Sequence, residues 1–391
     1  MISVSQALEA LFALTRPQPS EFCPLTQAAG RVLATPITAR LTQPPFAASS
    51  MDGYALNSVE ADLHAQFVVV GESAAGHGFT GKLGAGQAVR IFTGAPVPKG
   101  ADMVAIQEEV ERRGKLITLL TAYDGKSNIR PAGQDFKLGE QMSAPRRLTP
   151  SDIALAASMN HATLPVFKKP VVALISTGDE LVQPGESPAP EQIIASNTYG
   201  LKALLEANGA EVRILPIARD TRASLETVFA LSEGADLVVT IGGASVGDHD
   251  IVAEVAATLG LDQSFYKVAM RPGKPLMAGR MGNTMMVGLP GNPVSAMVCG
   301  HVFLLPVLGA MLGLGQAPAQ RFKATLSADL PANGPREHYM RATVAEGQIE
   351  AEIRQDSALL SVLARANALL IRPPHDGARA AGETVDYITL S

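Results

Sequence analysis

The sequence predicts a multidomain protein in which a central α/β domain is combined with smaller all-β modules. With 391 residues, of which 47% are apolar and 18% charged, the chain can form several buried cores. Apolar runs alternate with segments of helical periodicity between residues 170 and 316, which predicts a doubly wound parallel sheet. Short strand-like runs in residues 67–140 and 321–391 predict a β module on each side of that domain.

The net charge argues against some binding partners, and the cysteine content argues against some kinds of site and some cellular compartments. The formal net charge of −5 argues against a nucleic-acid-binding surface dominated by cations. The two cysteines, Cys23 and Cys299, lie far apart, which excludes a disulfide framework or a cysteine-rich zinc site and suits a reducing cytoplasm. Residues 1–17 lack a basic lead-in and a clear cleavage site, so they predict a short amphipathic helix. We expect a cytoplasmic protein that binds neither nucleic acid nor a membrane.

One long apolar stretch raises the alternative of a membrane span. Residues 281–320 contain no Asp, Glu, Lys or Arg, and residues 294–312 alone are long enough to cross a bilayer. His301 and Pro306 interrupt this stretch, and a strand and turn rich in glycine and proline precede it directly. We therefore predict a buried helix in a core or at a dimer interface.

The first part of the chain is predicted to be extended and rich in turns. A helix at the N-terminus is followed by extended segments up to about residue 45 and by the turn pair Asp52-Gly53. Short strands separated by glycine and proline then fill residues 67–140. Residues 148–160 predict a helix that begins at either Thr149 or Ser151 as the N-cap.

Acidic residues follow the predicted strands of the α/β domain. Strands at 171–177, 211–218 and 236–243 alternate with helices, of which the first is capped by Ser196 and stops at Gly209. Ligands of doubly wound sheets bind at the carboxyl ends of the strands. Glu180, Asp220 and Asp250 lie at or just after such ends, so we expect them to form a site.

Residues 236–296 are predicted to bind an anion. Two strands end in glycine-rich turns that open helices, where free N–H groups favour negative charge. Neither GxGxxG nor GxxxxGK[ST] occurs here, so the loop differs from the common nucleotide-binding ones. Pro293 suits the first turn of the second helix. Between the turns lie three cations, Lys267, Arg271 and Lys274.

Ten segments match a known family in family order. They are PPFAASSMDGYAL, VGESAAG, VRIFTGAPVPKGADMV, IRPAGQD, ISTGDEL, SNTYGL, ARD, TIGGASVGDHD, KVAMRPGKP and GLPGNPVSA. The chain resembles the MoeA-type molybdopterin molybdenumtransferases, which are related to the E domain of gephyrin and to its plant counterpart. Each segment alone is weak evidence, but ten in order over nearly the whole chain are highly specific.

The resemblance implies an elongated homodimer whose subunits have four domains. Residues 1–45 and 141–169 would form an extended helical domain from two chain segments, and residues 46–140 an inserted β domain. Residues 170–316 would form a MoaB/MogA-like α/β domain that binds molybdopterin, and residues 317–391 a C-terminal β domain.

The resemblance also implies the reaction. Adenylylated molybdopterin and molybdate would bind, the pyrophosphate link would be hydrolysed with release of AMP, and molybdenum would pass to the dithiolene sulfurs. Mg²⁺ would be required. An upstream adenylyltransferase and the molybdoenzymes that accept the cofactor would be further partners.

Several acids acquire roles from the resemblance. Asp52 and Asp135 would face the pterin site, Asp52 across the dimer interface. Without the resemblance, Asp52 would be interpreted as a turn residue and Asp135 as a solvated loop acid. Glu180 and Asp250 would bind Mg²⁺, which prefers carboxylate and phosphate oxygens. Asp220 would organise the metal or a water. Asp220 and Asp250 each precede a helix, so N-capping is the alternative for both.

The basic residues would bind molybdate and phosphate, which need cationic donors. Lys267, Arg271 and Lys274 could otherwise be solvated surface charges. Arg271 departs from the family, because lysine is common at this position. Its planar guanidinium should still bind an oxyanion, but a role that requires a neutral amine is in doubt.

The other predicted contacts are to the pterin and the nucleotide. Ser176 and Gly178 would line the nucleotide side. Backbone close to the ligand would come from two groups of residues: Gly242, Gly243, Ser245 and Gly247 in the first turn, and Pro290, Gly291, Asn292, Pro293 and Ser295 in the second. Ser357 matches a family serine weakly. His249 and His338 lack metal-ligand spacing and receive no role.

Two other functions stay open. A molybdopterin adenylyltransferase of the MogA type would share the α/β core but need neither β module. A non-enzymatic scaffold of the gephyrin E type would not need acidic and basic residues clustered in a site, so the predicted clusters argue against it.

Overall fold

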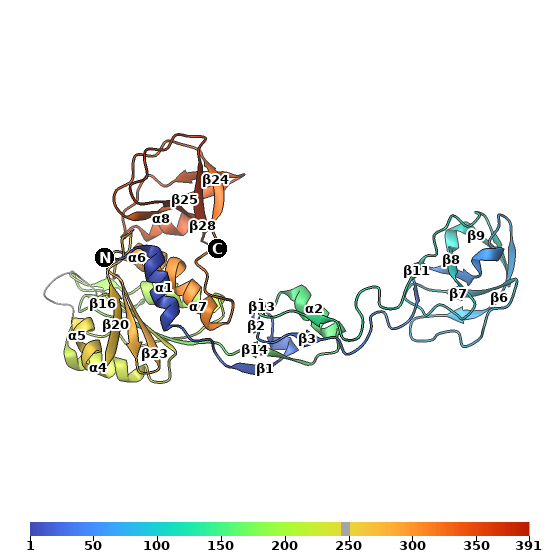
Figure 1. Ribbon diagram of the computed structural model, residues 1–391, viewed down its shortest axis with the longest axis horizontal. Helices are drawn as coiled ribbons and strands as arrows, with labels where there is room; N and C mark the ends of the chain where they lie inside the picture. The colour runs from blue at the N-terminus through green and yellow to red at the C-terminus, as the bar shows by residue number, and fades with distance from the viewer. Residues whose placement is uncertain (244–250, 391) are drawn as a thin grey trace.

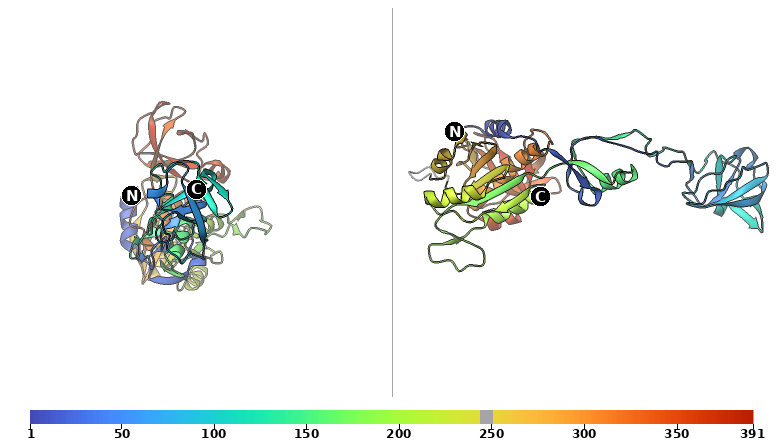
Figure 2. Two further views of the ribbon diagram at one scale, coloured as in Figure 1. Left: turned by 90° about the vertical axis from the view of Figure 1, so that its right-hand side faces the viewer. Right: turned by 90° about the horizontal axis from the view of Figure 1, so that it is seen from below.

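The computed structural model describes residues 1–243 and 251–390, and the molecule is strongly elongated (Figure 1). An α/β unit and a C-terminal β unit lie together at one end. A small middle piece follows, and a second β unit lies at the far end, joined to the middle piece by two passes of extended chain (Figure 2). Both termini lie at the end that holds the α/β unit.

A mixed sheet forms the core of the α/β unit. Its strands are β15 (Val171–Ser176), β18 (Glu211–Ile214), β19 (Leu237–Ile241), β20 (Leu261–Tyr266), β22 (Met277–Met281) and β23 (Thr284–Leu289). They lie in the order β18-β15-β19-β23-β22-β20, parallel from β18 to β23 and antiparallel beyond. The predicted doubly wound domain is confirmed, and the antiparallel edge is an addition to it.

Helices cover both faces of this sheet. They are α3 (Asn197–Ala207), α4 (Arg222–Leu231), α5 (Ile251–Thr258), α6 (Pro293–Cys299) and α7 (Leu305–Met311), with the π-helical turn η4 (Gly300–Leu304) between the last two. Val172 and Leu174 of β15 share a core with α3, α6 and α7, whereas Ala173 and Ile175 share one with α4 and α5. This alternation follows from the pleat of a strand buried on both faces.

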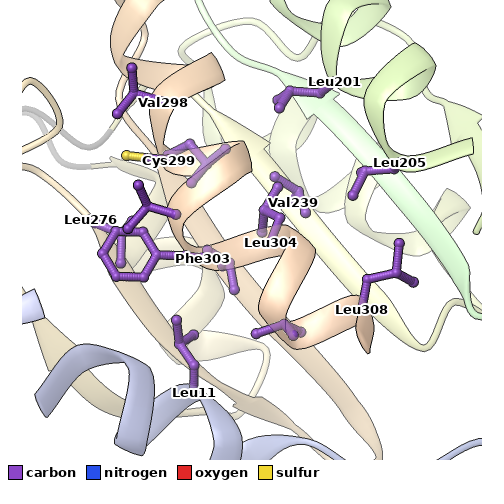
Figure 3. Packing of buried hydrophobic residues seen from close by; sticks show 14 of the residues in the cluster. Leu11, Leu201, Leu205, Val239, Leu276, Val298, Cys299, Phe303, Leu304 and Leu308 are labelled. Carbon is purple, nitrogen blue, oxygen red and sulfur yellow. The ribbon is translucent and has the colours of Figure 1, made fainter. Parts of the chain in front are cut away.

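The long apolar stretch forms a core helix. Pro293–Met311 has a mean hydropathy of 1.9, and 83% of its apolar window is buried within the protein. Its side chains Val298, Cys299, Phe303, Leu304 and Leu308 point into a common cluster with α3 and the sheet (Figure 3). The helix therefore packs as we predicted from the interrupting histidine and proline.

The N-terminal helix α1 (Val4–Leu14) belongs to the same core. A capping box at Ser3 starts it, and Leu8, Leu11 and Phe12 are buried in the cluster that also contains β22 and α7 residues. The resemblance placed this helix, as part of residues 1–45, in the extended helical domain that also includes residues 141–169. In the structure the apolar face of α1 packs on the α/β unit, while the chain after it extends away (Figure 1).

The middle piece is built from both chain segments that flank the far β unit. Its elements are β1 (Ser20–Pro24), η1 (Leu25–Gln27), β2 (Val32–Leu33), β3 (Ile37–Thr38), β12 (Gln141–Met142), β13 (Arg146–Arg147), α2 (Pro150–Ser158) and β14 (Thr163–Phe167). The order β1-β14-β2-β13 forms one sheet, and β12 pairs with β3. Thr149 caps α2 in a capping box with Asp152, which decides between the two predicted caps.

The far β unit has its own small core. Its elements are β4 (Ala48–Ser49), β5 (Gly53–Leu56), η2 (Ser58–Glu60), β6 (Gln66–Ser73), β7 (Gln87–Ile91), β8 (Met103–Ile106), η3 (Gln107–Glu109), β9 (Val110–Arg113), β10 (Leu116–Leu119) and β11 (Ile129–Arg130). The main sheet has the order β8-β5-β7-β6-β10-β9. The short predicted strands are thus confirmed.

One strand of the C-terminal sheet, β21, comes from the chain segment between two strands of the α/β unit. Its elements are β21 (Met270–Arg271), β24 (Phe322–Leu326), β25 (Glu337–Ala345), β26 (Gln348–Ala351), α8 (Leu360–Arg365), β27 (Ala368–Arg372) and β28 (Thr384–Thr389). β21 pairs in parallel with β25, so that Arg271 lies opposite His338. The predicted cationic segment therefore lies at the junction between the two units.

The position of α1 can be tested by truncating one buried side chain. Leu11 is 0% exposed, so Leu11→Ala should lower the free energy of unfolding by about 2–5 kcal/mol. Urea unfolding followed by far-UV circular dichroism measures this. Glu9→Ala on the exposed face is the matched control and should change it by less than about 0.5 kcal/mol. Equal effects of the two substitutions would contradict the packing described.

Candidate functional site

A cavity of about 960 Å³ opens at the carboxyl ends of β15, β19 and β23. This is the edge where ligands of doubly wound sheets bind. The predicted site residues that line it are Ser176, Gly178, Glu180, Asp220, Gly242, Gly243, Pro290, Gly291, Asn292 and Pro293. Lining residues that we did not predict include Thr177, Asn197, Glu254 and Pro275. The fold thus brings together residues more than a hundred positions apart.

Gly178 shapes the acidic side of the cavity. Its φ is +147°, and a Cβ at this position would lie 2.3 Å from Glu180 Oε2. Only glycine therefore allows the Glu180 carboxylate to fold back over the end of β15. Beyond it the chain forms a narrow loop whose ends pair as β16 (Leu181–Val182) and β17 (Ile193–Ile194).

Asp220 lies across the same edge, after β18. The N-cap of α4 is Thr221, whose hydroxyl accepts a hydrogen bond from Ser224 N at 3.4 Å. The capping alternative for Asp220 is therefore wrong. The Asp220 amide donates to Asp179 Oδ1 at 3.2 Å, and its carboxylate faces the cavity as a lining group.

The two glycine turns lie against each other. A Cβ on Gly291 would lie 3.5 Å from Gly242 Cα, and a Cβ on Gly242 would lie 2.7 Å from Thr177 O. Gly242 and Gly243 also have φ of +98° and +67°. These positions leave backbone, without side chains, at the cavity wall, as we predicted for close approach of a ligand.

The second turn opens α6. Pro293 occupies its first turn as predicted, and Asn197 Nδ2 donates to Gly291 O at 2.7 Å. Val294 N donates to Ser357 O at 3.0 Å, so Ser357 contacts this helix start through its main chain. Ser295 is 3% exposed beside it. One of the helix N–H groups is thus already satisfied by the C-terminal unit.

Part of the first turn lies outside the described residues. Ser245, Gly247, His249 and Asp250 belong to residues 244–250. The proposed second metal ligand, Asp250, and its N-cap alternative therefore stay predictions.

None of the three predicted cations, Lys267, Arg271 and Lys274, lines the cavity. Arg271 and Lys274 are exposed, and Pro275, directly after Lys274, is a lining residue. Lys267 has φ of +70°, and its Nζ lies 4.8 Å from the Tyr266 ring centroid. Arg271 continues into the C-terminal sheet beside His338.

Arg341 of β25 is a candidate that the sequence did not reveal. It is 0% exposed; Nη2 donates to Asp356 O at 3.1 Å, while Nε and Nη1 have no partner in the described part of the chain. Burial, and then the charge of Arg271, lowers the pKa of Arg341 to about 10, against the opposing effect of Asp356 and Glu352. Two free donors in a buried guanidinium indicate a site for an anion.

His338 lies in the same positive field. It is 7% exposed, its Nε2 has no partner within residues 1–243 and 251–390, and burial lowers its pKa to about 4. Arg271 is the next largest cause, followed by Arg341 and Arg336. Among described residues, no ion pair neutralises these three arginines. Residues 356–358 connect this cationic cluster to the cavity, since Ala358 lines it.

Asp52 and Asp135 lie away from the cavity of their own chain. Asp52 belongs to the far β unit, where Thr93 N and Thr93 Oγ1 donate to its Oδ1 at 2.8 and 2.7 Å and hold its pKa below the usual value. Asp135 is exposed in the connecting segment, where its amide donates to Gln43 O at 3.1 Å. One chain does not gather all the predicted acids, because the extended connection separates the units (Figure 1).

Comparison with known families matches nearly the whole chain. Residues 2–160 match the MoeA N-terminal region (domains I and II), residues 173–310 a probable molybdopterin binding domain, and residues 323–390 the MoeA C-terminal region (domain IV). The molybdopterin molybdenumtransferase of Haemophilus influenzae is 34% identical over 395 residues, which cover 98% of each chain. That of a Nostoc species is 35% identical, over 95% of this chain and 89% of its own.

This chain belongs to the molybdopterin molybdenumtransferase family. A solved structure of the molybdopterin biosynthesis MoeA protein of Pyrococcus horikoshii is 27% identical, with a TM-score of 0.86 over the full length of both chains. The resemblance inferred from the ten segments is thereby confirmed, and the protein is a transferase.

The fit between Gly178 and Glu180 gives a test of the acidic side. Gly178→Ala should displace the Glu180 carboxylate and lower turnover at least about tenfold, equivalent to about 1.4 kcal/mol of barrier. Gly185→Ala is the matched control, because Gly185 also has a positive φ (+93°) but a Cβ there meets nothing within 4 Å. A similar loss in both variants would mean that backbone strain alone, and not the displaced carboxylate, is responsible.

Proposed function

We propose that this protein inserts molybdenum into adenylylated molybdopterin, hydrolysing the pyrophosphate link and releasing AMP, to form molybdenum cofactor. The observation that carries the proposal is the arrangement of two sets of opposite charge: Glu180 and Asp220 line the cavity, and the cluster of Arg271, Arg336 and Arg341 is linked to it through residues 356–358, of which Ala358 lines the cavity. A divalent cation fits the first and an oxyanion the second. The names of the relatives agree with this reaction.

The acidic side fits Mg²⁺. Mg²⁺ usually binds one or two carboxylates and completes its shell with water and substrate phosphate oxygens. The described residues contain no group of three or more His, Cys, Asp or Glu that could hold a metal. Glu180 and Asp220 supply oxygens, and Asp250 is the further predicted ligand. Bound there, Mg²⁺ would neutralise charge on the pyrophosphate.

The cationic cluster fits molybdate, a tetrahedral dianion and a substrate. Arg341 offers two free donors from a buried position, and Arg271 adds charge from the neighbouring strand. Because a guanidinium stays protonated at neutral pH, Arg271 binds an oxyanion as a fixed cation and does not act as a base. Lys267 and Lys274 would extend the positive field toward the phosphates.

The backbone of the cavity would hold the pterin and the nucleotide. Gly242, Gly243 and Gly291 leave main chain at the wall, and Ser176 and Asn292 add polar groups. Fixed dipoles in such a wall orient a phosphate without reorganising during the reaction.

A homodimer would complete the site. We propose that Asp52 and Asp135 of a second copy reach this cavity, since those of the same chain do not. The middle piece offers an apolar surface for the association: Phe22 is 78% and Leu138 66% exposed, both beside a groove of about 610 Å³. Such exposed side chains favour contact with another protein surface. We propose that the dimer is cytoplasmic.

The contribution of the C-terminal unit favours this reaction over simple adenylylation. Ala358 lines the cavity from that unit, and Arg341 donates to the nearby Asp356 O; a single-domain adenylyltransferase would have no counterpart for them. Pure scaffolding would not require a buried guanidinium without a counterion, which costs free energy.

Release of AMP from adenylylated molybdopterin tests the proposal. It should require both molybdate and Mg²⁺. Glu180→Gln removes one charge with little change of shape and should lower the rate by about 10²-fold, the range expected for loss of one electrostatic contact. Glu191→Gln, on the exposed loop, is the control. Release that ignores molybdate, or formation of adenylylated product from ATP, would instead support the adenylyltransferase.

If Arg341 binds molybdate, replacing it should weaken molybdate binding without lowering the stability of the fold. Arg341→Met should leave the free energy of unfolding unchanged or higher, because it removes a fully buried charge that forms no ion pair among the described residues. The same substitution should weaken molybdate binding at least about tenfold, equivalent to about 1.4 kcal/mol. Isothermal titration calorimetry and urea unfolding measure the two effects, with exposed Arg354→Met as the control. Unchanged molybdate affinity would exclude Arg341 from the site.

A further inference from the structure

The guanidinium of Arg219 spans the loop that carries Glu180. Its Nη1 donates toward Gly178 O, Asp179 O and Leu181 O at 3.3, 3.0 and 3.1 Å. One cationic nitrogen thus donates to main-chain carbonyls on both sides of Glu180 in the sequence. Hydrogen bonds from a charged donor are stronger than those between neutral groups.

Arg219 also stands immediately before Asp220 in the chain. Two further contacts join its segment to the end of β15: Gly178 N donates to Ala218 O at 3.1 Å, and Asp220 N donates to Asp179 Oδ1 at 3.2 Å. Glu180 and Asp220, two of the acids that line the cavity, therefore belong to two segments joined by main-chain, carboxylate and guanidinium hydrogen bonds.

The charge of Arg219 is not used in an ion pair. In the described residues no salt bridge joins it to Asp179, Glu180 or Asp220, although all three carboxylates belong to the segments it contacts. An arginine paired with Glu180 or Asp220 would compete with a cation for their oxygens. Directed at carbonyls, it orders the loop and leaves those oxygens available.

We infer that Arg219 is a positioning residue that holds Glu180 and Asp220 at the spacing required to share one divalent cation. This inference rests on the proposed function, since that function assigns the two acids to the metal. Arg219 acts before the chemical step: its hydrogen bonds to the loop form without a cation, so cation binding does not have to create them. Losing Arg219 should therefore weaken binding of the cation more than it slows the reaction of the loaded enzyme.

Binding of Mn²⁺ to the full-length protein, measured by electron paramagnetic resonance, tests this without any turnover. Arg219→Met keeps the aliphatic stem, removes the donors, and should raise the Mn²⁺ dissociation constant about tenfold. Arg219→Lys, which retains a charged donor, should recover most of the affinity. Arg213→Met on β18, whose Nη2 donates to Glu233 O at 3.1 Å, is the control and should bind as the unchanged protein does.

A second readout separates positioning from a general structural role. In AMP release, Arg219→Met should raise the Mg²⁺ concentration for half-maximal rate about tenfold and leave the maximal rate within about twofold. Should Arg219→Met fail to fold, Arg219→Gln replaces it, and unchanged Mn²⁺ affinity in that folded variant overturns the inference.

The control Glu180→Gln distinguishes the two levels of the argument. Mn²⁺ binding that is insensitive to Glu180→Gln would defeat the proposed metal site itself. Binding that is lost in Glu180→Gln but unchanged in Arg219→Met would leave the metal site standing and defeat the role of Arg219.

Discussion

The close approach of main chain at the carboxyl ends of the parallel strands is the constraint on which the site depends. Gly178, Gly242 and Gly243 adopt positive φ where a side chain would collide with Glu180, Thr177 or Val252. Because no side chain fills this edge, a cavity remains where buried strands would otherwise be covered. The acids beside it and the turns that form its wall all take their positions from this absence of side-chain volume.

Sequence periodicity was sufficient to predict the strands and helices of the α/β unit, because apolar runs and cap residues are local signals. Thr149 and Pro293 act at helix starts as their residue types predict. Ser196 lies at the start of α3 but makes no side-chain capping bond, and Gly209 follows the end of that helix with φ of +99°. Local signals predicted α1 as an amphipathic helix, but they did not identify the surface on which it packs, because much of that surface lies hundreds of residues away in the chain.

The candidate site could be predicted only in part, because some of its residues come together only through contacts between distant segments of the chain. Motifs identified the strand ends that carry Glu180, Asp220 and the glycine turns. Arg341 cannot be recognised from its local sequence, because an arginine in a strand looks like any other charged residue until the fold buries it; within the described residues it then forms no ion pair. Asp52 and Asp135 were recognisable by family pattern, yet their distance from the cavity depends on the extended connection, which no short pattern encodes.

The strand β21 has a further mechanical consequence. Met270 and Arg271 leave the α/β unit and pair with β25, while residues 312–321 join the same two units elsewhere. Two separate covalent crossings, one of them pinned by ladder hydrogen bonds, resist twisting far better than a single tether. The orientation of the C-terminal unit against the α/β unit is therefore restrained more strongly than a single linker would restrain it.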